Sequence, residues 1–192
     1  MKTIKLNIDG KIVEVEEGTT ILQAARLIGA DIPTLCYDER LTPYGGCRLC
    51  TVEITTQNKT KFVASCIYPV QQGLLVNTDS EIIRKIRKMI IELILPISPT
   101  GPLEKLAARY HIKKSRFKAE KTSCILCGLC VRYCAEIKKA KAIDFVGRGI
   151  NRNISAISEI APYMCSSCRE CLSICPSGGL ISIISNRNMV SQ

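Results

Sequence analysis

The sequence predicts an α+β protein with an amino-terminal β-grasp domain at residues 1–78, a helical connector at 79–118 and a duplicated domain at 119–192. Three observations support this prediction. The chain opens with a hairpin pattern followed by a helical pattern, which is how a β-grasp begins. An apolar stripe of helical period follows in the middle of the chain. Two cysteine-rich segments of the same spacing then occur about forty residues apart, which indicates an internal duplication.

The first sixteen residues have the pattern of a β-hairpin. Ile4, Leu6 and Ile8 alternate with polar residues, and a second strand is expected at residues 11–16. Asp9-Gly10 lies between the two strands, and this dipeptide is a strong signal for a two-residue turn. The chain is therefore expected to begin with two antiparallel strands.

A short helix and a third strand are expected next. Apolar residues recur at helical spacing at four positions, Ile21, Ala24, Ala25 and Ile28. Thr19 or Thr20 can cap the start of this helix, and Gly29 can end it. A strand is expected at residues 51–55, where apolar and polar residues alternate.

The connector is predicted to be helical. Apolar residues recur at helical period from Glu81 to Leu95, and basic residues occupy the other side of the same segment, Arg84, Lys85, Arg87 and Lys88. Prolines and a glycine at residues 96–102 end this helix. A shorter helix is expected from Leu103 to Tyr110.

The carboxy-terminal domain contains two similar segments, CILCGLCVRYCAEI at 124–137 and CSSCRECLSICPSG at 165–178. Each is followed by a short apolar run, Ala142–Val146 and Leu180–Ile184, that can form a strand. Both segments have the spacing C-x2-C-x2-C-x3-C, and only the second is followed by proline, at Pro176. Ala135 occupies the matching position of the first segment, which can change the hydrogen bonding near Cys134.

The composition limits the compartment and the use of the twelve cysteines. The first fifteen residues contain no continuous apolar segment, so we expect no signal peptide and a location in the reducing cytoplasm. Cysteines in that compartment are expected to bind metal rather than to form disulfides. All uninterrupted apolar runs are far shorter than the roughly 20 residues that span a bilayer, so no membrane insertion is expected.

The spacing of the carboxy-terminal cysteines is typical of 4Fe-4S clusters. A tightly curled C-x2-C-x2-C loop can bring three thiolates to one cubane, while the fourth cysteine lies about one helical turn farther on. In two-cluster ferredoxins the fourth cysteine binds the cluster of the other segment. The first cluster is therefore expected to bind Cys124, Cys127, Cys130 and Cys175, and the second Cys165, Cys168, Cys171 and Cys134. Structural zinc is the alternative, but these runs supply more closely spaced thiolates than zinc sites use.

The amino-terminal cysteines form a looser group, Cys36, Cys47, Cys50 and Cys66. Their spacing suits a 2Fe-2S cluster held by four thiolates, and Gly45-Gly46 allows the backbone to come close to it. The spacing by itself leaves zinc open as an alternative.

The stretch PTLCYDERLTPYGGCRLCTVEI at 33–54, with Cys66 downstream, resembles a known iron-sulfur domain. It is similar to the 2Fe-2S domain that begins the large iron-sulfur subunit of NADH-quinone oxidoreductase, iron-only hydrogenases and the diaphorase subunits of NAD-linked hydrogenases and formate dehydrogenases. The resemblance implies a plant-type ferredoxin-like fold for the first domain and a bacterial two-cluster ferredoxin-like fold for the last. It implies one 2Fe-2S cluster and two 4Fe-4S clusters.

The chain departs from this family in two respects. Relatives commonly carry a His-x3-Cys-x2-Cys-x5-Cys cluster after the long helix, whereas residues 96–112 contain no cysteine. His111 is the single histidine and is expected to be a surface or packing residue. The sequence also shows no molybdopterin domain and no hydrogen-activating domain, so we expect a non-catalytic subunit.

The expected function is electron transfer within a multi-subunit oxidoreductase. Clusters pass single electrons, and the sequence has no G-x-G-x-x-G segment to hold a nicotinamide or flavin cofactor. The resemblance therefore implies an NAD(P)H-oxidising flavoprotein subunit as one partner. The resemblance also implies a hydrogenase, formate dehydrogenase, other reductase or ferredoxin as the other partner, and hence a hetero-oligomer. A stand-alone ferredoxin-like electron shuttle or redox sensor is the alternative.

The formal charge of +10 is not a strong argument for nucleic-acid binding. Twelve thiolates and three oxidised clusters would bring the charge to about +4. A local basic run precedes the first tight cysteine group, Lys113, Lys114, Arg116, Lys118 and Lys121. We interpret this run as a solvated face, with docking of an acidic partner as the alternative. Nucleic-acid binding is not expected because no stacking platform is evident.

Overall fold

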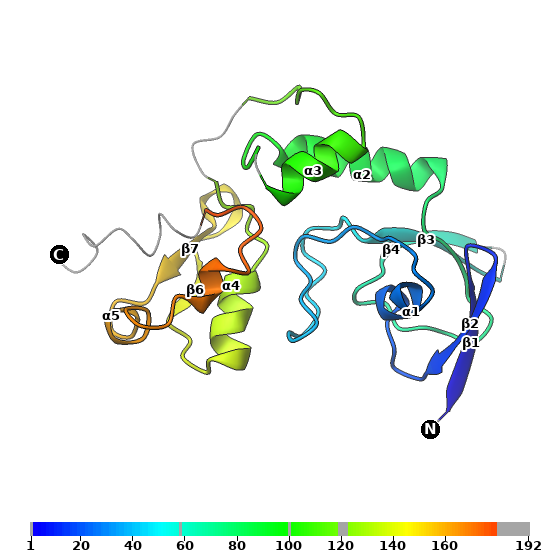
Figure 1. Ribbon diagram of the computed structural model, residues 1–192, viewed down its shortest axis with the longest axis horizontal. Helices are drawn as coiled ribbons and strands as arrows, with labels where there is room; N and C mark the ends of the chain where they lie inside the picture. Colours follow the sequence, from blue (N-terminus) through cyan, green and yellow to red (C-terminus); the bar gives the residue numbers. More distant parts are fainter. Residues whose placement is uncertain (1, 58, 100, 119–122, 180–192) are drawn as a thin grey trace. The chain divides into compact units, whose positions relative to one another are not determined.

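The computed structural model describes residues 2–57, 59–99, 101–118 and 123–179 (Figure 1). The chain divides into two compact units. The first unit contains Met1–Tyr37 and Pro43–Ile91, and the second contains Asp38–Thr42 and Glu92–Gln192. Within the described residues, no helix has both the length and the apolar character needed to cross a membrane.

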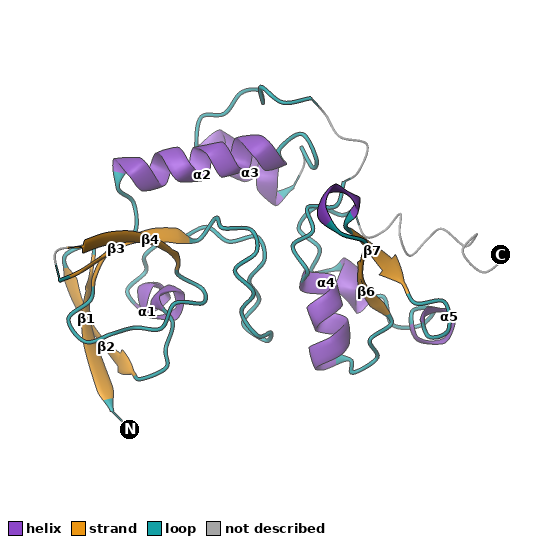
Figure 2. Ribbon diagram, turned by 180° about the vertical axis from the view of Figure 1, so that it is seen from behind, coloured by secondary structure: helices purple, strands orange, loops and turns teal. Residues whose placement is uncertain are grey.

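The first unit is built on a five-stranded mixed sheet (Figure 2). Its strands are β1 (Thr3–Ile8), β2 (Lys11–Glu16), β3 (Thr51–Thr56), β4 (Lys59–Ala64) and β5 (Leu75–Asn77). Their spatial order is β2-β1-β5-β3-β4, and β1 and β5 are parallel whereas the other neighbours are antiparallel. This arrangement confirms the predicted β-grasp architecture and the predicted strand at 51–55.

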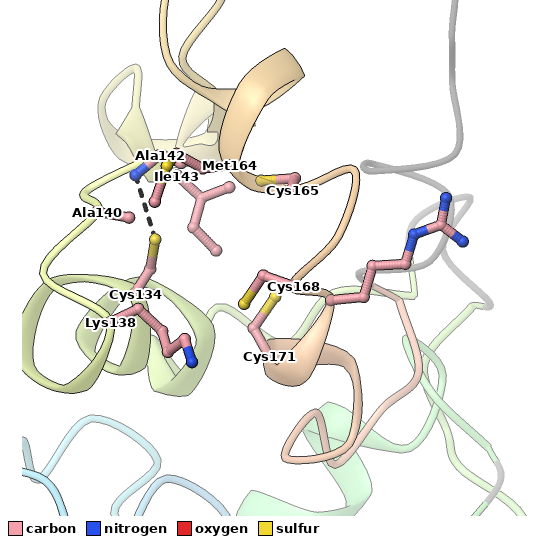
Figure 3. Close-up of a pocket in the computed structure, with 10 residues that line it drawn as sticks. Cys134, Lys138, Ala140, Ala142, Ile143, Met164, Cys165, Cys168 and Cys171 are labelled. Carbon is pink, nitrogen blue, oxygen red and sulfur yellow. Dashed lines mark hydrogen bonds between the residues drawn. The ribbon is translucent and has the colours of Figure 1, made fainter.

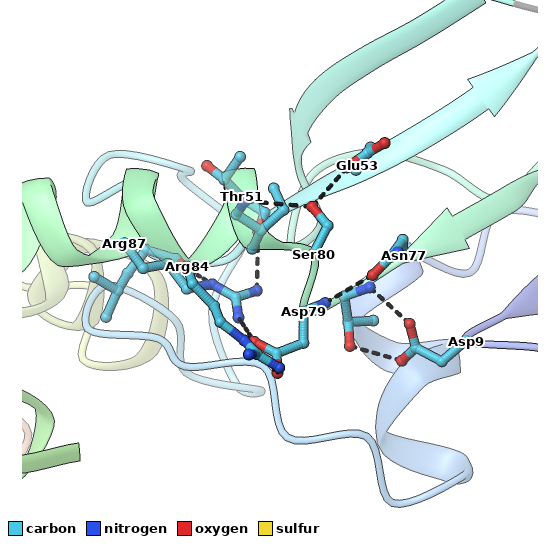
Figure 4. A network of polar contacts seen from close by, with 11 residues as sticks. Asp9, Thr51, Glu53, Asn77, Asp79, Ser80, Arg84 and Arg87 are labelled. Carbon is cyan, nitrogen blue, oxygen red and sulfur yellow. Dashed lines mark hydrogen bonds and ion pairs between the residues drawn. The ribbon is translucent and has the colours of Figure 1, made fainter. Parts of the chain in front are cut away.

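The predicted hairpin is present. Ile8 pairs with Lys11, and the turn between them places Asp9 at φ 50° and Gly10 at φ 84°. Two successive residues of positive φ give the turn that matches the twist of antiparallel strands, and Asn7 Oδ1 accepts a hydrogen bond from Gly10 N at 2.8 Å. The Asp9 carboxylate also accepts bonds from Thr78, at 2.7 Å from N and 2.6 Å from Oγ1, which ties the hairpin to the end of β5 (Figure 4).

The predicted first helix is α1 (Ile21–Leu27). Thr20 is the residue that caps it, because its hydroxyl accepts a bond from Gln23 N while the Gln23 side chain accepts one from Thr20 N. Gly29 has φ 74° just after the helix, as expected of a helix stop. Ile21, Ala24 and Ala25 are fully buried within the core that α1 shares with the sheet.

Two helices follow the sheet, α2 (Glu81–Ile94) and α3 (Pro102–Arg109). Both agree with the expected helices within a residue. The prediction that Arg87 lies on the polar side of α2 is wrong, because Arg87 is 1% exposed. It lies four residues after Ile83 and four before Ile91, so all three share the buried stripe of the helix.

The second unit contains short elements around two cysteine segments. They are α4 (Leu129–Arg132), a π-helix at Tyr133–Ile137, β6 (Ile143–Val146), a 3-10 turn at Gly149–Asn151, β7 (Asn153–Ala156), α5 (Ala161–Met164) and a 3-10 turn at Glu170–Leu172. The predicted strand at 142–146 is present as β6, and its partner is β7. The predicted strand at 180–184 lies outside the described residues.

The duplication is visible in the backbone. Gly128 and Arg169 each follow the second cysteine of their segment, and both have positive φ, 72° and 47°. A left-handed residue at this position bends the chain between the second and third cysteines. Glycine adopts this conformation freely, whereas Arg169 does so at a cost of about 1 kcal/mol.

The segment Asp38–Thr42 is held by the helical part of the second unit. Thr42 N donates to Glu136 Oε2 at 2.7 Å, and Thr42 O accepts from Arg132 Nη1 at 2.6 Å. The Arg40 guanidinium lies 5.2 Å from the centre of the Tyr133 ring.

Candidate iron-sulfur centres

The four amino-terminal cysteines are brought together by the pairing of β3 with β4. Cys50 directly precedes β3, and Cys66 follows β4 by two residues. Because Thr51 pairs with Ala64, these two ends of the hairpin lie side by side. Ser65 strengthens the junction, since its N–H and hydroxyl donate to Cys50 O at 3.1 and 2.8 Å.

The sulfur atoms of this group form two close pairs. Cys47 N donates to Cys36 Sγ at 3.3 Å. A hydrogen bond between the two side chains raises the pKa of Cys36 and lowers the pKa of Cys47 to about 6. In the same way, the side-chain bond between Cys50 and Cys66 lowers the pKa of Cys50 to about 6 and raises that of Cys66.

This arrangement fits a 2Fe-2S centre, in which each of two irons takes two thiolates. Cys36, Cys50 and Cys66 are each 1% exposed, so the sulfurs are largely shielded from water. Gly45 has φ 67°, and a Cβ added to Gly46 would lie 2.5 Å from Cε1 of Tyr44. The two glycines therefore allow a tight course of the loop before Cys47, while the close approach of this backbone to a cluster stays a prediction.

Arg87 of α2 supports the same loop through its backbone. Its Nε donates to Leu49 O at 3.2 Å, and its Nη2 donates to Thr51 O at 2.9 Å (Figure 4). Its Nη1 lies 4.0 Å from Asp79 Oδ1. Sequence reasoning missed this residue, although its position four residues from Ile83 and Ile91 was a signal that it faces the core.

The carboxy-terminal cysteines cross between the two segments. A cavity of the second unit is lined by Cys165, Cys168 and Cys171 of the second segment together with Cys134 of the first (Figure 3). Cys134 Sγ accepts a hydrogen bond from Ala142 N at 3.1 Å. Burial, followed by the neighbouring Cys165, Cys134 and Cys168, raises the pKa of Cys171 to about 11.

A helix carries Cys134 to this cavity. α4 begins just before Cys130 and continues as a π-helix through Cys134 and Ala135. Proline in place of Ala135 would remove a backbone N–H from this helix. In the first segment, which has alanine in place of this proline, the helix continues past the fourth cysteine. In the second segment, which has the proline, no helix runs through Cys175-Pro176.

The remaining sulfurs gather around Cys130. Burial raises the pKa of Cys130 to about 12, with further contributions from Cys127, Cys171, Cys124 and Cys175. Burial also raises the pKa of Cys124, and Cys175 adds to this effect. The chain after Cys175 approaches the first segment closely, because a Cβ added to Gly179 would lie 2.7 Å from Ser123 O and 2.9 Å from Cys124 N.

Both groups of four have the donor set of a 4Fe-4S centre, which is all thiolate. Within the described residues, no three His, Cys, Asp or Glu side chains are placed to hold one metal ion. All twelve cysteines are free of disulfides. In a 4Fe-4S centre each of the four thiolates would bind a different iron atom, so the sulfurs would be farther apart than the ligands of a single ion.

Comparison with known proteins agrees with this geometry. Residues 1–81 match the 2Fe-2S iron-sulfur cluster binding domain family, and residues 123–179 match the 4Fe-4S dicluster domain family. The alpha subunit of the NADPH-Fe(3+) oxidoreductase of Geobacter sulfurreducens is 34% identical, and the match covers 93% of this chain and 24% of that protein. A subunit of the NADH-quinone oxidoreductase of Rickettsia conorii is 33% identical over 93% of this chain and 30% of its own length.

A solved structure is also similar. A chain of the NAD+-reducing [NiFe]-hydrogenase in the H2-reduced state matches with a TM-score of 0.71 and 29% identity, covering 81% of this chain and 75% of that chain. The present chain belongs to the iron-sulfur region of this oxidoreductase and hydrogenase family. It spans about a quarter to a third of the length of the curated relatives named above.

Membership of this family accounts for all twelve cysteines. The 2Fe-2S domain match includes the four amino-terminal cysteines, and the dicluster match includes the other eight. This iron-sulfur region thus has one 2Fe-2S domain and one domain for two 4Fe-4S clusters, as predicted. Its single histidine, His111, is exposed after α3, which agrees with the expected surface role.

A polar network joins the two cysteine segments of the iron-sulfur region. Glu170 lies beside Cys171, and its carboxylate accepts from Tyr133 Oη at 2.7 Å and from Lys138 Nζ at 2.5 Å. Lys138, and then Tyr133, hold the pKa of Glu170 below its usual value. Tyr133 in turn precedes Cys134, so the network ties the helix that carries Cys134 to the segment that supplies the other three sulfurs.

The basic run before the first 4Fe-4S segment is exposed at Lys113, Lys114, Arg116 and Lys118, as a solvated face requires. Arg116 also forms an ion pair with Glu92, at 2.7 Å between Nε and Oε1. Lys121 lies outside the described residues.

Proposed function

We propose that this chain is an electron-transfer subunit of a multi-subunit oxidoreductase. It relays single electrons between an NAD(P)-linked flavoprotein subunit and a hydrogenase, formate dehydrogenase or other reductase, or a ferredoxin. The observation that carries this proposal is the meeting of Cys134 with Cys165, Cys168 and Cys171 in one cavity. That crossed arrangement is typical of domains that hold two clusters close together, which is what electron relay requires.

The way the cysteines gather supports the following ligand sets. A 2Fe-2S centre would be held by the two close pairs of cysteines, Cys36 with Cys47 and Cys50 with Cys66. One 4Fe-4S centre takes Cys124, Cys127, Cys130 and Cys175, and the other takes Cys165, Cys168, Cys171 and Cys134. When bound, these clusters accept and donate one electron at a time.

The protein residues prepare the sites for this chemistry. Backbone N–H groups stabilise negative charge on sulfur, as Cys47 N does at Cys36 and Ala142 N does at Cys134. Burial of most of the sulfurs excludes water and oxidants. Two basic residues, Lys138 and Arg169, also line the cavity that contains Cys134.

Partners are needed because hydride must be split into single electrons by a flavin. The relatives named above are subunits of NADPH- and NADH-linked oxidoreductases, which supports a flavoprotein partner in a hetero-oligomer. We place the complex in the reducing cytoplasm, where twelve free cysteines remain available to iron.

Two measurements test this function. The chain is expected to co-purify anaerobically with a flavin-containing protein and, when separated from it, to show no NADH oxidation with an artificial electron acceptor. Restoring the flavoprotein is expected to reduce the clusters with NADH. A cluster-loaded monomer that never associates with a flavoprotein would instead support a mobile shuttle or a redox sensor, and NADH oxidation by the isolated chain would refute the division of roles.

A further inference from the structure

We propose that Arg87 is a positioning residue of the 2Fe-2S centre that also raises the reduction potential of that centre. This inference rests on the ligation by Cys36, Cys47, Cys50 and Cys66 proposed above and is independent of the partner proteins. It arises from an unusual placement of charge, since Arg87 is the largest of the fully buried side chains in the described residues and lies on a helix that supplies no cysteine.

The backbone on both sides of Cys50 is held by Arg87. The residue before Cys50 is Leu49, and its carbonyl accepts a hydrogen bond from Arg87 Nε at 3.2 Å. The residue after Cys50 is Thr51, and its carbonyl accepts one from Arg87 Nη2 at 2.9 Å. The fork of the guanidinium fixes the direction of both carbonyls at once, which a single hydrogen bond cannot do. In Figure 4 the Arg87 side chain extends from α2 toward Thr51.

The carbonyl of Cys50 itself is held from another side. It accepts from the N–H and the hydroxyl of Ser65, at 3.1 and 2.8 Å. Three successive carbonyls, those of Leu49, Cys50 and Thr51, thus have bound partners. The main chain at Cys50 has little freedom left, so the Cα–Cβ bond that carries the sulfur points in one direction.

The charge of Arg87 acts in addition to its geometry. Arginine remains positively charged at all physiological pH values, and this guanidinium is 1% exposed, so water screens it weakly. Only five covalent bonds join Leu49 O to Cys50 Sγ, which places the cation within about 9 Å of that sulfur. Each reduction adds one electron and hence one negative charge, which a nearby cation stabilises.

The size of the effect can be bounded. At an effective dielectric constant of about 20, an uncompensated unit charge at about 9 Å changes the equilibrium constant for a one-electron reduction by roughly twentyfold. The Asp79 carboxylate, 4.0 Å from Arg87 Nη1, offsets part of this charge but is 55% exposed, which leaves an effect of about tenfold. A tenfold change corresponds to about 59 mV. Neutralising Arg87 is therefore expected to lower the midpoint potential of the 2Fe-2S centre by about this amount.

The test is a redox titration of the full chain, prepared anaerobically and reduced stepwise with dithionite. The 2Fe-2S signal is followed by EPR at a temperature at which 4Fe-4S signals are broadened. Arg87→Met is expected to lower the equilibrium constant for reduction about tenfold. Arg87→Lys is expected to stay within about threefold of the parent chain, because it keeps the charge, and to change the EPR g-values, because one ammonium replaces a two-armed donor.

Arg84→Met is the matched control. Arg84 lies on the same helix and carries the same charge, but its side chain is 64% exposed and pairs with Asp79 at 2.7 Å. Its removal is expected to change the equilibrium constant less than threefold, since solvent screens exposed charges.

Each outcome decides the proposal. An Arg87→Met chain that is folded, fully loaded and unchanged in potential and g-values would show that Arg87 only stabilises the fold. An Arg87→Lys chain with a tenfold loss, or with unchanged g-values, would also overturn the combined role. Loss of the 2Fe-2S signal from both variants, with the circular dichroism spectrum of the fold retained, supports positioning. Loss of the fold in both variants contradicts it.

Discussion

The crossed ligation of the two 4Fe-4S centres can be tested by counting iron in single and double variants. A chain with all three centres holds about ten irons. Cys134 lines the cavity that contains Cys171, whereas Cys130 does not line that cavity and is expected to bind with the first segment. Cys134→Ala is therefore expected to remove one cubane and leave about six irons. Alanine is preferable to serine because a serine oxygen can still bind iron.

The double variants give the sharper result. Adding Cys171→Ala to Cys134→Ala damages a centre that is already lost, so about six irons are expected to remain. Adding Cys130→Ala to Cys134→Ala damages the second cubane as well, so about two irons are expected. Two residues that act on one centre are non-additive, and residues that act on separate centres are additive.

The assay is the iron and acid-labile sulfide content per chain after anaerobic purification, with the 2Fe-2S EPR signal as an internal standard for folding. If the damaged cubane keeps some of its iron, the iron content of every variant changes. The double variant with Cys171→Ala is still expected to hold more iron than the double variant with Cys130→Ala. The reverse ranking, about two irons for the Cys134 and Cys171 pair and about six for the Cys134 and Cys130 pair, would refute the crossed arrangement.

Three further substitutions test other parts of the structure. Thr20→Ala removes the cap of α1 and is expected to lower the free energy of unfolding by about 1 kcal/mol, measured by denaturant titration. Gly179→Ala forces backbone atoms near Cys124 apart and is expected to cost about 1–3 kcal/mol and to reduce 4Fe-4S content. Ala135→Pro interrupts the π-helix that carries Cys134 and is expected to cost about 3 kcal/mol and to lower iron content.

Each of these substitutions has a neighbouring control. Thr19→Ala is expected to leave stability nearly unchanged, and equal losses at both threonines would contradict the capping role. Gly178→Ala has no atom within 4 Å of the new Cβ, so it is expected to retain its clusters, at the cost of a strained φ of 67°. Ala135→Ser keeps the backbone N–H and is expected to retain its iron. A fully loaded Ala135→Pro chain would show that the helix can end at Cys134.

Local patterns were enough to predict most elements of the first unit. Asp9-Gly10 defines the hairpin because its turn type depends on residues in direct succession. The two ends of α1, at Thr20 and Gly29, are also set by neighbouring residues, since caps act within one turn of the helix. β5 was not predicted, because it is three residues long and is held between β1 and β3 by partners distant in sequence. β4 and β7 were also not predicted, and β7 is a four-residue strand that pairs with the preceding β6.

The candidate sites show the same division between local and distant effects. Close spacing within each C-x2-C-x2-C run indicated iron-sulfur chemistry, and the general rule for two-cluster ferredoxins indicated which fourth cysteine each run receives. The limits predicted for the domains, 78 and 118, stay predictions. Arg87 was assigned to the wrong face of α2, because charge alone suggested solvent whereas helical spacing placed it with Ile83 and Ile91.

The sequence by itself determined the number and spacing of the cysteine groups, the opening hairpin and the helices, since each depends on a local pattern of residues. Only the tertiary structure decided that Cys36 pairs with Cys47 and Cys50 with Cys66, and that a buried cation lies beside the backbone of Cys50. The physical reason is that these contacts depend on how strands and helices pack, and packing joins residues whose separation along the chain carries no local signal.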